Sequence, residues 1–198
     1  MGKKDEVAQF VERKIHFLQE GKDGGENKAV LANLRRGVGC EPGELPQLFG
    51  IILMDMPKKF MSEDGVPTKE EWSCYIALTL YALHQQGNEM GNRSMHTEEC
   101  IDLGTAMWEL ASSYEDSNAE QRMLQRMRML STSADMKELS YHLRGVVQLL
   151  KSKGIPLNYR ILAADLYELQ CLDGKKHVHL RWGQSFFQSK TRSNASSK

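Results

Sequence analysis

Apolar residues recur along most of the chain with the three- and four-residue spacing of amphipathic helices. The clearest stripe lies within 136–151, and its members are Leu139, Leu143, Val146, Val147 and Leu150. A similar stripe runs from Val7 to Leu18, after which Gly21 is placed to end the helix. No segment alternates apolar and polar positions as a half-buried strand does. The pattern therefore predicts an all-α protein.

Start and stop signals divide the chain into about eight helices. Thr68 and Glu71 form a capping-box pattern, which opens a long helix that Gly87 is placed to end. Thr97 and Asn118 are expected to cap two later helices. Further helices are expected over about 29–36, 45–54, 136–151, 161–169 and 175–188.

Short connections join these helices, so we expect an all-helical bundle with a single domain over 1–188. A division into two lobes, about 1–115 and 116–188, is the alternative within the same fold class. The last segment, 189–198, is polar and rich in serine and lysine, and we expect it to be disordered.

Composition excludes several classes of protein. Of the 198 residues, 40% are hydrophobic and 26% are charged, which is ordinary for a soluble domain. No apolar run approaches the roughly 18 residues that span a bilayer, and the first residues contain no signal-peptide core. The four cysteines form no C-x-x-C pair and are expected to be reduced. These features favour a cytoplasmic protein that does not enter a membrane.

The charges are segregated along the chain although they cancel in total. There are 26 basic and 26 acidic side chains. Residues 1–120 carry 12 basic and 21 acidic side chains, whereas residues 121–198 carry 14 basic and 5 acidic ones. A chain with this division can present a basic surface to a polyanion while remaining neutral as a whole.

No residue pattern predicts catalysis or a resident metal ion. The chain has no Walker-type phosphate loop, and the glycines at 37 and 39 follow a helix rather than a strand. His177 and His179 would point about 200° apart on a helix, which does not suit a shared metal ion. His84 lies at a predicted helix end, where it can cap carbonyl groups or contact a nucleic-acid backbone. We therefore expect a protein without catalytic residues, metal or cofactor.

Cations form regular stripes on the predicted helices. Lys137, Arg144 and Lys151 are seven residues apart and lie within about 40° of one another on one helix face. The other candidates are grouped at helix ends or one turn apart: Arg35, Arg36, Arg122, Arg126, Lys175 and Lys176. Charged helix faces are usually only solvated, and this interpretation stays open for each residue alone. The whole set indicates contacts with phosphate groups, without readout of bases.

Short motifs follow one another from about residue 7 to residue 188, among them 33–37, 82–86, 103–106, 121–124, 139–144, 149–151 and 181–187. Their order and spacing resemble CasB, the small-subunit family of the type I-E CRISPR surveillance complex Cascade. The resemblance implies an all-helical, non-enzymatic subunit that lies beside the backbone and large subunits of Cascade and beside a second copy of itself. It also implies contacts with the backbone of CRISPR RNA and target DNA, including the displaced strand, that stabilise the R-loop.

The resemblance implies nucleic-acid contacts at seven of the candidate positions, which are assigned by motif match: Arg35, Arg36, Arg122, Arg126, Arg144, Lys175 and Lys176. Lys137 and Lys151 rest on the helix-stripe argument. The loop around Arg93 departs from the family pattern, so Arg93 is not among the candidates.

Two other functions stay open on the sequence. A helical adaptor would dock its basic half on an acidic protein surface without touching nucleic acid. A hydrolase would depend on His84 and an occasional carboxylate. The salt dependence of binding to single-stranded DNA separates the adaptor from a backbone-binding protein, because phosphate binding releases counterions and gives a steep slope.

Overall fold

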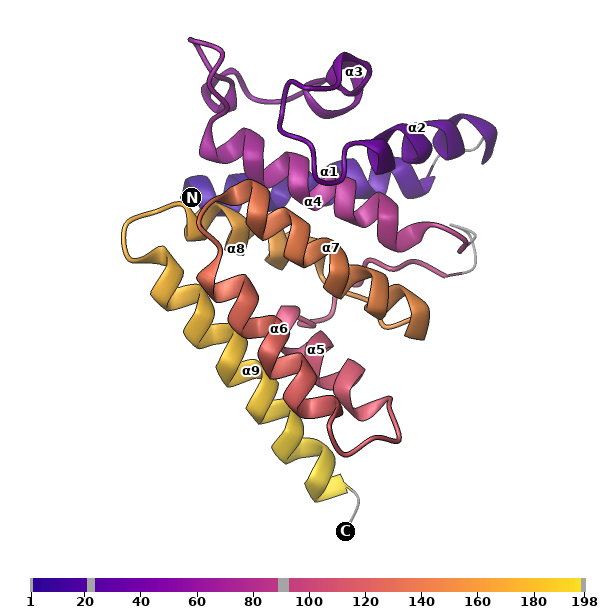
Figure 1. Cartoon of the computed structure of the whole chain (residues 1–198). Coiled ribbons are helices and arrows are strands. Elements are labelled where there is room, and N and C mark those ends of the chain that lie inside the picture. Colours follow the sequence, from indigo (N-terminus) through magenta and orange to yellow (C-terminus); the bar gives the residue numbers. More distant parts are fainter. Residues whose placement is uncertain (1, 21–23, 89–92, 197–198) are drawn as a thin grey trace.

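The computed structural model describes residues 2–20, 24–88 and 93–196, which contain nine α-helices, two short 3-10 helices and no strand (Figure 1). The α-helices are α1 (Lys3–Glu20), α2 (Gly24–Arg36), α3 (Phe49–Ile52), α4 (Lys69–Gln85), α5 (Leu103–Ser112), α6 (Ala119–Thr132), α7 (Met136–Lys153), α8 (Tyr159–Leu169) and α9 (Gly174–Ser196). The 3-10 helices are η1 (Pro46–Leu48) and η2 (Lys58–Phe60). The predicted all-α fold class is confirmed.

Capping side chains explain where α4 and α5 begin. In the predicted capping box of α4, the Glu71 amide donates to Thr68 Oγ1 at 3.0 Å and the Thr68 amide donates to Glu71 Oε2 at 2.8 Å. The prediction that Thr97 caps α5 is wrong. Asp102 takes that position, and its carboxylate accepts a hydrogen bond from a first-turn amide at 2.9 Å.

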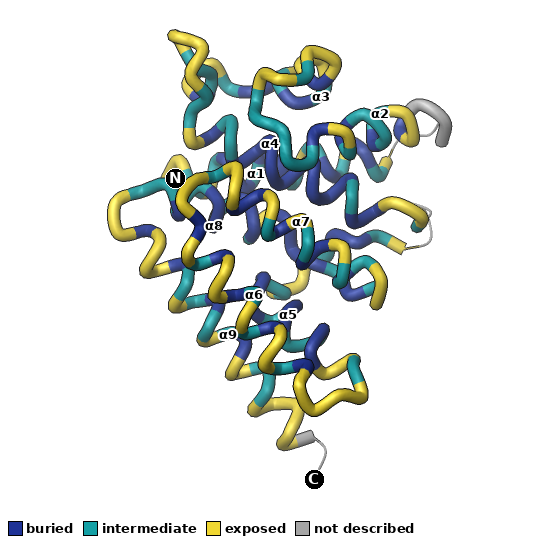
Figure 2. The backbone as a smooth tube through the Cα atoms, in the orientation of Figure 1, coloured by how far each residue is buried: buried dark blue, intermediate teal, exposed yellow. Residues whose placement is uncertain are grey.

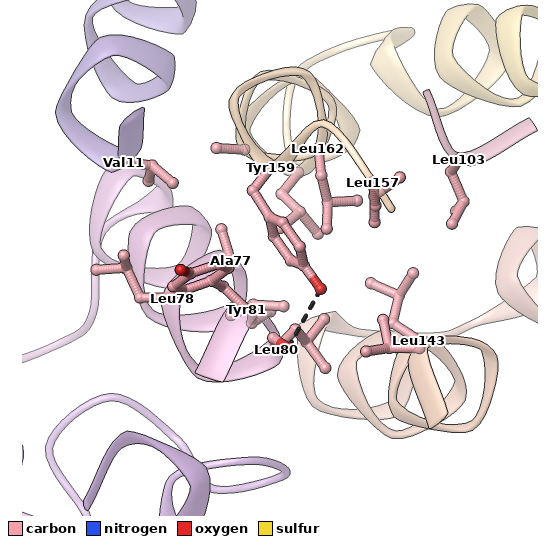
Figure 3. Packing of buried hydrophobic residues seen from close by; sticks show 14 of the residues in the cluster. Val11, Ala77, Leu78, Leu80, Tyr81, Leu103, Leu143, Leu157, Tyr159 and Leu162 are labelled. Atoms are coloured by element: carbon pink, nitrogen blue, oxygen red, sulfur yellow. Dashed lines mark hydrogen bonds between the residues drawn. The ribbon is translucent and has the colours of Figure 1, made fainter. Parts of the chain in front are cut away.

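The most buried helix is α4, which packs against α1, α2, α7 and α8 (Figure 1). Figure 3 shows part of this core, where Val11 of α1, Tyr81 of α4 and Leu143 of α7 lie around Tyr159 of α8. The Tyr159 hydroxyl donates to the carbonyl of Leu80 at 3.2 Å, which satisfies its polar group inside the apolar interior.

The two-lobe alternative, 1–115 and 116–188, does not match the packing. Helix α8 from the second segment packs against α1 and α4 of the first, while α5 from the first packs against α6, α7 and α9 of the second. Helices α5 and α9 can approach closely because residue 104 is a glycine: a Cβ at this position would overlap the carbonyl group of Trp182. The helices of the two segments therefore interleave around one apolar core.

The expectation of a disordered tail over 189–198 is also corrected, because α9 continues to Ser196. Lys190 pairs with Glu120 of α6 at 2.7 Å, and Trp108 of α5 donates from its indole nitrogen to Ser193 at 3.0 Å. These polar side chains find partners on neighbouring helices, which the composition of the segment alone does not reveal. Residues 197 and 198 lie outside the described residues.

Candidate nucleic-acid interface

Helix α7 carries the seven-residue series of cations on its outward side. Its apolar stripe is buried against α4, α5 and α6, and exposed positions recur between the buried ones (Figure 2). Lys137 lies near the start of the helix, Arg144 near its middle and Lys151 near its end. The three side chains share a helix side but not their surroundings, and the surroundings decide what each can bind.

The acidic residues of α7 are used at its N-terminus. Asp135 is the N-cap, and its carboxylate accepts from the Glu138 amide at 2.8 Å. Glu138 accepts from the Ala134 amide at 2.7 Å, and its other carboxylate oxygen lies 3.6 Å from the ring nitrogen Nε2 of His142. Carboxylates at this end are favoured by the helix dipole. The sequence of α7 contains no further acidic residue, so Arg144 has no carboxylate beside it on its own helix.

Lys137 is covered by carboxylates from the acidic first half of the chain. Its ammonium nitrogen lies 3.0 Å from Glu41 and 3.5 Å from Glu44, both in the segment that follows α2. The hydrogen bond and the negative charges raise the pKa of Lys137. An incoming phosphate would have to compete with two carboxylates, so this end of α7 is the least suited to bind a polyanion.

Arg126 of α6 extends to α7 close to Gly145, the residue that follows Arg144. A Cβ on Gly145, the neighbour of Arg144 in the chain, would be 3.5 Å from the guanidinium of Arg126. Neither arginine has a carboxylate within ion-pair distance among the described side chains. Two guanidinium groups without counter-charges raise the local potential, which a bound anion would relieve.

Lys151 and Arg35 place two more cations where the end of α7 lies near the end of α2. Lys151 Nζ donates to Gln86 Oε1 at 2.9 Å. Partial burial and the charge of Arg35 lower the pKa of Lys151. Arg36 is exposed beside Arg35 in the last turn of α2. The described side chains supply no ion pair for either arginine.

The remaining candidates have partners elsewhere. Arg122 and Lys176 form ion pairs with acidic residues close to them in the chain, Asp116 and Asp173. Lys175 donates to a carbonyl group in the connection between α6 and α7 at 3.3 Å. Apart from Arg36 and the carbonyl-bound Lys175, the predicted cations without carboxylate partners among the described side chains lie around the outer side of α7, and we call them the α7 basic face: Arg35, Arg126, Arg144 and Lys151.

His84 takes neither role considered from the sequence. It is fully buried, and its Nδ1 atom lies 3.1 Å from the hydroxyl of Tyr159. Burial lowers the pKa of His84 to about 4, so the ring is neutral at pH 7. A neutral ring inside the core cannot neutralise a phosphate.

A cluster that the sequence patterns did not predict joins α8 to α9. Arg181 binds Asp165 at 2.7 Å and Glu168 at 2.9 Å, and the indole nitrogen of Trp182 donates to Asp165 at 2.6 Å. Burial raises the pKa of Asp165, although these hydrogen bonds act in the opposite direction. The motifs that contain these residues therefore hold two helices together. The sequence signal for this pairing was weak because Asp165 and Arg181 are far apart in the chain.

Metal and membrane chemistry find no support in the part of the chain that the structure describes. No three of its histidine, cysteine, aspartate and glutamate side chains are grouped to hold a metal ion. No helix formed by these residues has the length and apolar character needed to cross a membrane.

Comparisons with known proteins agree with the helical architecture. The family model described as CRISPR-associated protein Cse2 matches residues 30–187. The chain is similar to the crystal structure of CasB from Thermobifida fusca, with 33% identity, a TM-score of 0.72, and coverage of 91% of this chain and 97% of that one. No curated protein matches the chain.

Two more distant structures support the fold. The Cse2-family CRISPR-associated protein from Thermus thermophilus is 21% identical with a TM-score of 0.66, and the similarity covers 95% of this chain and 99% of that one. CasB from M. ruber is 22% identical with a TM-score of 0.67, covering 95% and 98%. The family match extends over most of the chain, so this protein belongs to the Cse2 (CasB) family of CRISPR-associated proteins.

Proposed function

We propose that the protein is the small, non-catalytic subunit of a type I-E Cascade complex and that it stabilises the R-loop by binding nucleic-acid backbone. Family membership supports a place in a CRISPR system. The observation that carries the binding role is the α7 basic face, where neither Arg126 nor Arg144 has a carboxylate partner among the described side chains. Its ligands are the phosphates of target DNA and CRISPR RNA.

Phosphate binding explains why the face needs no base-reading geometry. Each cation that neutralises a phosphate releases a condensed counterion, which favours binding independently of base sequence. In an R-loop, pairing with the guide RNA reads the sequence, while protein cations favour the opened strands. The Cascade backbone and large subunits and a second copy of this chain are the protein partners in this proposal.

The test is a salt titration of binding to fluorescent single-stranded DNA. We expect affinity to fall steeply with salt, and Arg144→Ala to weaken binding to all sequences alike while reducing the slope by about 0.7–1 unit. Arg160→Ala is the matched control: Arg160 is exposed but pairs with Glu12 at 3.4 Å on the α1–α8 side. A slope near zero for the unmodified protein would contradict the proposal, and altered sequence preference in Arg144→Ala would contradict the phosphate role.

A second function, docking of a partner protein without nucleic acid, is favoured by one apolar groove between α1, α2 and α3. Phe17 and Met54 line it, with 70% and 59% of their surfaces exposed, and Lys14 is also part of the lining. An adaptor of this kind would bind its partner unchanged when Arg144 is replaced, and its affinity for single-stranded DNA would be negligible at every salt concentration.

A further inference from the structure

An exposed aromatic ring lies within the α7 basic face. Tyr141 is 66% exposed, and helix geometry places it one turn before Arg144 and one turn after Lys137. Gly145, beside which the guanidinium of Arg126 lies, is one turn further along. Tyr141 therefore projects from the middle of the outward side of α7, with cations before, after and beside it.

The ring is free to accept a ligand. Its described neighbour is His142, whose ring lies 5.5 Å away in an edge-on arrangement, and this contact leaves the outward part of the tyrosine uncovered. The carboxylate closest to it along the helix, Glu138, is engaged with the Ala134 amide and with His142. No acidic side chain of α7 is left to repel a polyanion from this position.

We propose that Tyr141 stacks on a nucleobase of single-stranded nucleic acid whose phosphates bind Arg126 and Arg144. This inference rests on the proposed function and adds a second kind of contact to it. Every base has a flat π-face, so stacking on an aromatic side chain adds affinity without sequence readout. A duplex keeps its bases stacked inside, and for this reason Tyr141 makes the face selective for an opened strand over a double helix.

The test compares three ligands that differ in whether a base can reach the ring: a fluorescent oligothymidine of about 20 nucleotides, an abasic strand of the same length and charge, and a duplex. Tyr141→Leu keeps apolar bulk on the helix but removes the flat ring. We expect it to weaken oligothymidine binding about 5- to 150-fold. Binding to the abasic strand and the duplex, and the salt slope, should not change.

Two variants serve as controls. Tyr141→Phe retains the ring and should bind oligothymidine within about twofold of the unmodified protein, as stacking does not require the hydroxyl. Phe187→Leu removes an exposed aromatic residue from α9, outside the α7 basic face, and should leave binding unchanged. Circular dichroism of each variant checks that the helices are retained.

The outcomes distinguish this inference from the proposed function. Equal oligothymidine binding by Tyr141→Leu and the unmodified protein overturns stacking, and the backbone-binding function still stands if Arg144→Ala weakens binding. Equal loss on the oligothymidine and abasic strands also overturns stacking, because it shows that the ring supports phosphate contacts. If no strand binds with a salt slope, both proposals fail.

Discussion

The α8–α9 junction and the α7 basic face both contain arginines from the second half of the chain, but they use them in opposite ways. At the junction, Arg181 is held by Asp165 and Glu168, and the hydrogen bonds to these carboxylates raise the pKa of its guanidinium. On the α7 basic face, Arg126 and Arg144 have no such partners among the described side chains. Arginines of the same charge thus hold two helices together at the α8–α9 junction and remain available to bind a ligand on the α7 basic face.

The difference follows from which carboxylates the fold brings near each cation. Asp165 is buried, so its charge requires a positive partner, and Arg181 supplies it. The carboxylates of α7 are instead engaged at the helix N-terminus. A cation is therefore a candidate binding residue when the acidic groups around it are already satisfied elsewhere.

The largest expected effect is a loss of folding stability at low pH. It tests how strongly the apolar interior disfavours protonated histidine. Burial lowers the pKa values of His84 and His96 to about 4, below the usual 6.5. As pH falls from 6.5 to 4, the unfolded chain takes up protons that the folded protein resists, so folding stability decreases. The upper value of the loss is about 3 kcal/mol for each histidine.

Denaturant unfolding between pH 7.5 and 4.5 measures this loss. His84→Gln removes one titrating group and should flatten the pH dependence even if it lowers stability overall. His142→Gln, which changes a histidine outside the core cluster, controls for the loss of an imidazole side chain. A stability that stays constant from pH 6.5 to 4.5 would show that the two buried rings are not the groups that resist protonation.

The next effect separates the two arginines directly. Arg181→Ala leaves buried Asp165 with Trp182 as its remaining hydrogen-bond partner. We expect a loss of about 2–3 kcal/mol in the free energy of unfolding, moderated because the Arg181 side chain is 40% exposed. Arg144→Ala should change stability by less than about 0.5 kcal/mol. Similar stability losses for the two variants would remove the contrast between the regions.

The smallest expected effect concerns Lys137, which lies on the outward side of α7 but is paired with carboxylates, as Arg181 is. Replacing its partners with Glu41→Gln and Glu44→Gln removes two negative charges and frees the lysine for phosphate. We expect single-stranded DNA affinity to rise about 3- to 10-fold at low salt, with a slope about 0.7 unit steeper. Fluorescence anisotropy at several salt concentrations measures both quantities.

Two further variants show whether Lys137 is responsible for that gain. Lys137→Ala alone should change affinity by less than about twofold, because surface ion pairs already neutralise this lysine. Combined with the double glutamate variant, it should abolish the steeper slope. The double variant Glu12→Gln/Glu98→Gln, which removes two carboxylates that pair with other residues, controls for the change in net charge. If this double variant raises affinity as much, the gain reflects total charge and not the release of Lys137.

Much of the fold could be predicted because its determinants are local. The stripe of Leu139, Leu143 and Val147 and the capping box at Thr68 act within one or two helical turns, so they are visible along the chain. The error in the tail occurred where long-range contacts decide. Disorder was the wrong expectation for the tail because its pairing with α5 and α6, through residues such as Lys190, cannot be seen in its composition.

The candidate site could be predicted as a set of cations but not as an arrangement. The seven-residue spacing places Lys137, Arg144 and Lys151 on one side of α7, and the helix has that geometry. The cation pattern alone does not point to Tyr141, although the same periodicity places it among them. A search for aromatic residues between cations at helical spacing would find it.

The sequence by itself determined the helices, their apolar faces and the spacing of the positive side chains, because these depend on interactions over a few residues. Only the tertiary structure decided which cations remain available. Glu41 reaches Lys137 from another part of the chain, whereas no described carboxylate reaches Arg144. Electrostatic pairing depends on distance in space, and charged residues far apart in the sequence come within pairing distance only when their helices pack.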